Sequence, residues 1–236
     1  YFVPSMEEYD FRIDLTADVE GSVNDLNLSS LFISVSEGSY FDGDVSLKGL
    51  PSIDSVQVAL NINVLQTSKL DLETIDFTKF GITEKVEIPG QLSSLGDIFV
   101  TGNSHGYYHD FDVSLDIITD VGVTTGSFVC KIDTTKELNY DGYLTTAGID
   151  LSGLTNSSVF GNFTSDLNIK GKGLTIEDLD VLVDGHLNKF DLNGYTYDKV
   201  NINGHFKEKS FDGVLNVYDQ NIDLNFEGNI DLSKAP

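Results

Sequence analysis

The sequence is poor in positive charge. Its 236 residues contain 14 Lys and Arg against 38 Asp and Glu, which gives a formal net charge of −24, and Arg12 is its one arginine. A protein that binds nucleic acid through the backbone needs a basic surface that displaces counterions from the phosphates. The same negative charge opposes electrostatic binding to an anionic membrane surface. The composition therefore argues against a nucleic-acid partner, and any lipid contact has to be made by apolar side chains.

Long apolar runs and cysteine pairs are also missing. Because the sequence has no run of about 18 apolar residues, it predicts no membrane-spanning helix. It does not open with the charged and then apolar segment of a secretory signal. Since residue 1 is Tyr, we expect the chain to be a mature or excised part of a longer protein. The single Cys130 cannot form an internal disulfide. Because it lies two residues from both Phe128 and Ile132, on the same face of a strand, we expect its side chain to be buried among apolar residues.

Residues that favour helices are scarce. The chain has four Ala and one Met, and its acidic residues are 27 Asp and 11 Glu, the reverse of the helical preference. The 22 Gly, together with many Asn and Asp, suit turns that need a positive φ. These counts predict an all-β chain with many tight turns.

Apolar and polar residues alternate over long stretches. The longest are Tyr9 to Val19 and Ile222 to Leu232, and shorter ones are Val56 to Val64, Phe111 to Ile117, Phe128 to Ile132 and Val200 to Phe206. Since a strand turns successive side chains to opposite faces, each stretch predicts a strand with one apolar and one polar face. Parallel sheets instead have continuous apolar runs. We therefore expect a long antiparallel sheet that curls, closes or packs on a second sheet.

Three aromatic-Asp-Gly triplets repeat at irregular spacing, at Phe41-Asp42-Gly43, Tyr140-Asp141-Gly142 and Phe211-Asp212-Gly213. Because Asp and Gly tolerate a positive φ, we interpret the triplets as recurring hairpin turns.

Other segments lack clear alternation. Pro89-Gly90 predicts a turn, Ser68 to Phe80 a short helix or an irregular connection, and Ala147 to Thr164 a long loop. The composition does not change along the chain, so residues 1–236 are expected to form one unit.

Signatures of catalysis are missing. His105 and His109 flank Gly106-Tyr107-Tyr108, a context that predicts a loop rather than the helix that would bring both rings to one metal. No phosphate-binding glycine loop and no nucleophile elbow occurs. Asp42-Gly43-Asp44 is too short to specify a calcium loop. We expect neither an enzyme nor a cofactor nor a metal.

The C-terminal stretch from Phe211 to Ser233, followed by Pro236, resembles the repeats of TamB-like proteins of the AsmA-related family. In those repeats an Asp-x-Asn turn, here Asp219-Gln-Asn221, precedes an alternating strand that ends in Phe-x-Gly, here Phe226-Glu-Gly228. Similar phrases run from Gly21 to Leu28, Phe41 to Pro51 and Gly102 to Gly122. The resemblance implies a half-open β structure with an apolar lumen. It also implies a periplasmic segment of an envelope protein whose inner-membrane anchor, and whose contact with an outer-membrane β-barrel assembly protein, lie elsewhere in the chain.

Together these observations predict a curled, half-open groove that conducts phospholipid acyl chains between the two membranes. The side chains expected to line this groove are the apolar members of the alternating stretches, namely Phe11, Ile13, Leu15, Val56, Val58, Leu60, Phe111, Val113, Leu115, Ile222, Leu224 and Phe226. An unpaired charge in the groove, as in Val58→Asp or Leu224→Asp, is expected to stop lipid occupancy because burying it costs several kcal/mol.

Three alternatives remain open. The apolar faces of two sheets can cover one another in a closed β-sandwich. Open sheet edges can pair with strands of an outer-membrane client, which makes the chain an assembly scaffold. A closed core can also belong to an extracellular adhesive β domain, which a rise in melting temperature with calcium would indicate.

Overall fold

The computed structural model describes residues 13–35, 38–52, 55–74, 90–155, 157–174 and 178–231. The strands are β1 (Ile13–Ser22), β2 (Asp25–Val35), β3 (Ser39–Lys48), β4 (Gln57–Ser68), β5 (Asp97–Tyr107), β6 (Asp110–Thr119), β7 (Gly122–Ile132), β8 (Leu138–Asp150), β9 (Phe160–Lys172), β10 (Asp180–Leu192), β11 (Tyr195–Lys207), β12 (Ser210–Tyr218) and β13 (Asp223–Asp231). Short helices in the described ranges are α1 (Lys69–Thr74), the 3-10 helix η3 (Gly90–Leu95) and α2 (Leu151–Thr155).

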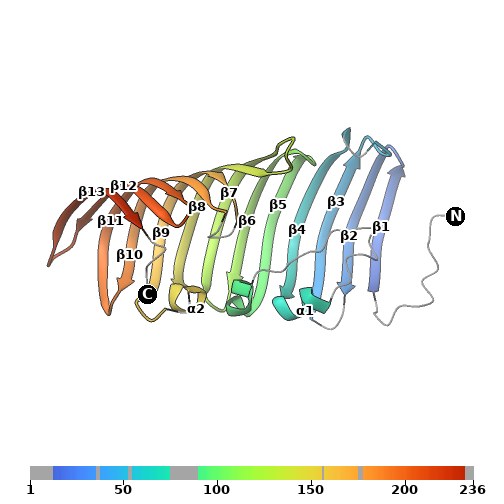
Figure 1. Cartoon of the computed structure of the whole chain (residues 1–236). Coiled ribbons are helices and arrows are strands. Elements are labelled where there is room, and N and C mark those ends of the chain that lie inside the picture. Colours follow the sequence, from blue (N-terminus) through green and yellow to red (C-terminus); the bar gives the residue numbers. More distant parts are fainter. Residues whose placement is uncertain are drawn as a thin grey trace.

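Within these residues all thirteen strands form one antiparallel sheet in sequence order. Each strand pairs with its neighbours in the chain, whereas the described residues show no pairing between β1 and β13. Figure 1 shows the strands standing side by side in a long row that bends over towards β13. This confirms the prediction of an all-β, curled antiparallel sheet that stays open, and a second sheet to complete a sandwich is not found in the described part of the chain.

The two ends of the strands differ. Odd-numbered strands finish at one end, here called the hairpin end, where the two-residue connections after β1, β5 and β11 lie. Even-numbered strands finish at the other, here called the helix end, where α1, η3 and α2 lie (Figure 1). There η3 contacts both α1 and α2, and α2 also packs on β9. The helices thus border one long side of the sheet.

The described parts of the alternating stretches lie in or beside strands, whereas residues 9–12 and Leu232 lie outside the described ranges. The expected loop over Ala147 to Thr164 is wrong. β8 continues to Asp150, α2 follows, and β9 begins at Phe160. The Ser and Asn residues of this region occupy polar positions of a strand as readily as positions of a loop, so composition misled the prediction. Ser68 to Phe80 does contain a short helix, α1, while residues 75–80 and Pro89 lie outside the described ranges.

The aromatic-Asp-Gly triplets are not turns. They lie inside β3, β8 and β12, with φ outside the left-handed region at Gly43, Gly142 and Gly213. An Asn-Gly hairpin turn occurs instead between β10 and β11, where Asn193 and Gly194 have φ of 52° and 79°. The glycines of the triplets are therefore needed for a reason other than a positive φ.

The main buried cluster belongs to the C-terminal strands. It contains Leu167, Val181, Val183, Leu187, Val200, Ile202, Phe211 and Val217, which come from β9 to β12. All of them lie on one side of the sheet, on positions that register with one another across the strands. In contrast, Leu15 of β1 is 64% exposed on the same side. The sheet therefore encloses its apolar face most where it bends.

Candidate functional site

One face of the sheet, here called the apolar face, carries rows of apolar residues and glycines that run across the strands. One row joins Gly43, Ile62, Gly102, Leu115, Gly126, Leu144, Leu167, Gly185, Ile202, Leu215 and Phe226. The next joins Val45, Leu60, Ser104, Val113, Phe128, Gly142, Ile169, Val183, Gly204, Gly213 and Gly228. Neither row contains a charged residue. The apolar face is thus continuous from β3 to β13, along the length of the molecule.

Over β7 to β13 this face encloses a cavity of about 750 Å³. Its lining is apolar throughout and consists of Phe128, Cys130, Leu138, Tyr140, Leu151, Phe160, Phe163, Leu167, Ile169, Leu174, Leu179, Val181, Val183, Leu187, Phe190, Ile202, Phe206, Phe211, Leu215 and Ile230. Leu151 comes from α2 at the helix end, and Leu174 and Leu179 come from the connection between β9 and β10 at the hairpin end. Side chains from both ends of the strands therefore border the cavity.

Aromatic rings lie flat against glycines in the cavity wall. A Cβ on Gly204 would approach Cζ of Phe211 to 2.6 Å, and one on Gly213 would approach it to 2.9 Å. Phe211 is only 2% exposed as a result of this packing. Phe41 covers Gly43 of β3 in the same way, at 2.7 Å. In these triplets the aromatic residue and the glycine share the apolar face while the Asp points outward, which explains the motif that the sequence prediction took for a turn.

The polar atoms of the apolar face are paired with each other. Thr146 and Ser165 join their hydroxyls at 2.9 Å, and Ser39 and Thr67 do so at 2.8 Å. Among the described residues no buried side-chain nitrogen or oxygen lacks a partner. Cys130 is 5% exposed, and burial together with the nearby Asp112 carboxylate raises the pKa of its thiol. The face therefore offers no unsatisfied polar group to a ligand.

The predicted groove residues lie mostly on this face but beside the cavity. Ile13 and Leu15 are on β1, Val58 and Leu60 on β4, and Phe111, Val113 and Leu115 on β6, while Val56 precedes β4 and is 8% exposed. Leu224 and Phe226 are on β13, and Ile222, just before it, packs with Phe226 against the buried cluster. Phe11 falls outside the described residues. None of the eleven predicted residues that are described belongs to the cavity lining.

Sequence analysis missed the residues of β8, β9 and β10 that line the cavity. On these strands the alternation is broken by glycine or by small polar residues, as in Tyr140-Asp-Gly142 and Ser165-Asp-Leu167. Counting inward glycine and serine as apolar-face positions would have extended the pattern through all three strands. The bend of the sheet that creates the cavity cannot be predicted from any one alternating stretch of the sequence.

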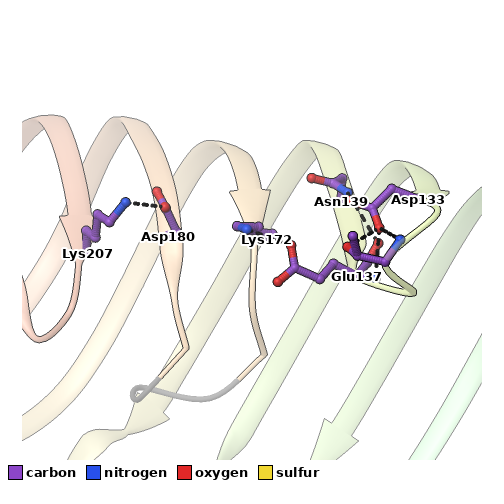
Figure 2. A network of polar contacts seen from close by, with 7 residues as sticks. Asp133, Glu137, Asn139, Lys172, Asp180 and Lys207 are labelled. Carbon is purple, nitrogen blue, oxygen red and sulfur yellow. Dashed lines mark hydrogen bonds and ion pairs between the residues drawn. The ribbon is translucent and has the colours of Figure 1, made fainter.

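A polar network crosses the hairpin end of β8 to β11 on the opposite face (Figure 2). Asp180 accepts hydrogen bonds from Nζ of Lys207 at 2.8 Å and from Nε2 of His205 at 2.6 Å. These two bonds lower the pKa of the Asp180 carboxyl to about 2. Lys172 donates to Glu137 at 2.6 Å, and this bond raises the pKa of the lysine. The ion pairs thus join β10 to β11, and β9 to the turn that precedes β8, on the face opposite the cavity.

The histidines do not converge. His105 lies on β5 rather than in the expected loop, and its Nε2 is 3.2 Å from Nε2 of Gln57. His109 lies in the turn that follows and stacks on Tyr107. Over the described ranges, no group of three or more His, Cys, Asp or Glu residues is placed to hold a metal ion.

Comparisons with protein-family models, with curated proteins and with solved structures found no match. In the part of the chain that the structure describes, no helix is long and apolar enough to cross a bilayer. The features that bear on function are therefore the geometry of the apolar face and the repeat-like segment from Phe211 to Ser233.

Proposed function

We propose that this chain is a non-enzymatic conduit whose apolar face carries the acyl chains of phospholipids. The observation that carries the proposal is the cavity of about 750 Å³, because all its lining residues are apolar and it opens onto a face that continues to β3. Ligand pockets for small molecules occupy about 300–1,000 Å³, so the cavity is large enough for a flexible hydrocarbon chain.

The rows on the apolar face favour movement as well as binding. An acyl chain that shifts from one strand to the next exchanges one set of apolar contacts for a similar one, so no residue-specific chemistry is required. Inward glycines alternate with larger side chains in the part of the row from Gly43 to Leu144, which gives similar surroundings at several places along the sheet. Head groups would stay in water at the rim, because burying an unpaired charge costs several kcal/mol.

The dimensions of the cavity agree with the length of an acyl chain. Seven strands, β7 to β13, border the cavity, and at about 4.8 Å per strand they span about 29 Å. The hydrocarbon core of a bilayer is about 30 Å thick, so one leaflet contributes about 15 Å. An acyl chain lying across the strands therefore fits within the cavity with room to move.

The proposal includes a location. We place the chain in the periplasm, as a segment of an envelope protein that is anchored in the inner membrane by another part and that bridges towards the outer membrane. The support for this part of the proposal is the likeness of Phe211 to Ser233 to repeats of the TamB-like proteins. An outer-membrane β-barrel assembly protein would contact another part of the same polypeptide.

A second candidate function follows from the open sheet. Neither β1 nor β13 has a second partner strand among the described residues, so each offers backbone groups to an incoming β-strand. This favours a scaffold that assembles outer-membrane proteins by strand pairing. Crosslinkers placed at Glu227 on β13 and at Ile169 on the apolar face distinguish the two functions. Capture of a protein from Glu227 supports the scaffold, and capture of lipid from Ile169 supports the conduit.

The test of the conduit uses the chain purified from cells, followed by native mass spectrometry and extraction of bound lipid. Ile169→Asp places a charge on the cavity floor, and Leu174→Asp places one at its border, where the side chain is 76% exposed. The matched control is Leu182→Asp, which adds the same charge on the opposite face, at a side chain that is 55% exposed. Melting curves of each variant report whether it remains folded.

We expect bound phospholipid in the unchanged chain and in Leu182→Asp, and much less in Ile169→Asp and Leu174→Asp. Since Leu174 is exposed, its replacement keeps the test valid even where Ile169→Asp unfolds. Equal lipid content in Leu174→Asp and Leu182→Asp, or no lipid in any folded sample, would contradict the conduit.

A further inference from the structure

The opposite, largely polar face of the sheet carries one apolar patch that the conduit does not use. Outward residues of six consecutive strands form this outer patch, namely Phe32 of β2, Tyr40 of β3, Val64 of β4, Phe99 of β5, Ile118 of β6 and Val123 of β7. All six lie towards the helix end of their strands. They alternate with residues of the apolar face, so the sheet itself cannot cover them.

Register and stacking bring these side chains together. Phe99 stands opposite Ile118, and Ile118 opposite Val123. Phe32 and Tyr40 stack with their ring centroids 5.9 Å apart. Gln66 lies between Tyr40 and Phe99 in the same row. The outer patch is thus a stripe that crosses the strands rather than a set of scattered apolar residues.

Several members of the stripe are open to solvent. Ile118 is 53% exposed, Val123 39% and Phe32 37%. Exposed apolar patches of this kind on an otherwise polar surface are typical of protein interaction sites. Neighbouring outward positions on the same strands bear polar side chains. Thr125, for example, donates a hydrogen bond to Asp116 at 2.6 Å.

Carboxylates lie within the outer patch and along its border. Asp42 stands between Phe32 and Val64 in register, at the outward position after Tyr40 on β3. Asp97 precedes Phe99 on β5, and Asp116 and Asp120 flank Ile118. Lys69, which follows β4 at this end, is already paired with Glu73 at 3.0 Å. Any partner that covers the stripe thus meets carboxylates on both sides.

Lysines concentrate at the opposite end of the sheet. Of the ten lysines that the structure describes, seven lie in the last three residues of odd-numbered strands or in the turns that follow, namely Lys48, Lys131, Lys136, Lys170, Lys172, Lys207 and Lys209. The helix end of β3 to β7 is therefore both apolar and acidic. A complementary partner would combine apolar residues with flanking positive charge.

We infer that the outer patch is a docking surface for an amphipathic helix of a partner protein, with an apolar stripe bordered by Lys or Arg. Within the outer patch, the row from Tyr40 of β3 to Val123 of β7 crosses four strand spacings, which at about 4.8 Å each is about 19 Å. A helix that rises about 1.5 Å per residue covers this length with about 13 residues. Such a helix would lie across the strands, with its basic margins beside Asp42, Asp97 and Asp116. This inference does not depend on lipid transport.

The experiment measures fluorescence anisotropy of a synthetic 15-residue helical peptide with leucines along one side and lysines on both margins. A shuffled peptide of the same composition keeps the charge and loses the apolar stripe. Ile118→Ser with Val123→Ser removes apolar surface from the patch without changing the charge of the protein. Leu182→Ser removes an equally exposed apolar side chain from the same face, away from the patch.

We expect the helical peptide to bind the unchanged chain and Leu182→Ser with similar affinity, and to bind Ile118→Ser/Val123→Ser at least about tenfold more weakly. The partner helix would cover both side chains, and a tenfold change in Kd corresponds to about 1.4 kcal/mol. Equal binding of the shuffled peptide would overturn the inference, since charge alone would then explain it. A dimer of the chain that dissociates in Ile118→Ser/Val123→Ser would also overturn it, because a second copy would then be the occupant.

Discussion

Individual glycines decide how closely the apolar face can pack. In β11 and β12, Gly204 and Gly213 leave the space in which the ring of Phe211 lies, and the ring in turn covers backbone that would otherwise meet the cavity. Covering a strand glycine with a cross-strand aromatic ring is a known way of stabilising sheets. The same residue types recur at Phe41 and Gly43 in β3. In these two triplets the aromatic residue packs on the glycine of its own strand, whereas Phe128 of β7 covers Gly142 in the third. In all three the outward Asp keeps the opposite face polar.

This account predicts that Gly204→Ala destabilises the fold. The added methyl would come within 2.6 Å of Cζ of Phe211, so the ring has to move, and such overpacking costs about 1–3 kcal/mol. Gly153→Ala in α2 is the matched control, because its methyl meets Cγ1 of Val121 at an ordinary 3.7 Å and alanine favours helix. Urea denaturation measures both. Equal stability of the two variants would contradict the packing role of Phe211.

Pairs of strands, rather than single strands, carry the polar network at the hairpin end. Asp180 of β10 binds two side chains of β11, and Lys172 of β9 binds Glu137 ahead of β8. Backbone ladders on both sides set the spacing of these strands. The ion pairs add side-chain contacts between β10 and β11 and between β9 and the turn before β8.

The network predicts a dependence of stability on pH. Hydrogen bonds from Lys207 and His205 lower the pKa of Asp180 from 3.8 to about 2 in the folded chain. A depressed folded-state pKa stabilises the fold above the unfolded value, and this stabilisation is lost as the pH falls from about 4 through 2. Asp180→Asn should therefore melt at a lower temperature than the unchanged chain at pH 7, and the difference should shrink towards pH 2. A difference that stays constant over this range would show that the ionised carboxylate is not responsible.

The alternation of apolar and polar residues predicted the strands more completely than it predicted how they are arranged. It placed strands at Phe111 to Ile117 and Val200 to Phe206, because alternate residues of a strand point to opposite faces of the sheet. It failed over Ala147 to Thr164, a stretch bounded by Thr146 and Ser165, whose hydroxyls pair across β8 and β9 and so occupy the apolar face. Such a pair is visible only once the register is known.

At the scale of the whole molecule, the apolar face is continuous but unevenly enclosed. Leu15 on β1 is 64% exposed, whereas Val181 on β10 is 4% exposed on the same face. Sequence analysis could name the face but not the cavity, since the bend of the sheet depends on how all the strands pack together and not on any one alternating stretch. The predicted groove residues are consequently found beside the cavity, and the lining comes chiefly from β7 to β12.

The central claim is that acyl chains occupy the cavity, and the absence of tryptophan from the sequence allows a direct measurement. Phe163→Trp places a single tryptophan in the cavity lining, and Tyr143→Trp places one on the opposite face, where Tyr143 is 44% exposed. Phospholipids with brominated acyl chains quench tryptophan fluorescence on contact. We predict strong quenching of Phe163→Trp and little quenching of Tyr143→Trp. Equal quenching at both sites, or none at Phe163→Trp while the protein remains folded, would contradict the claim.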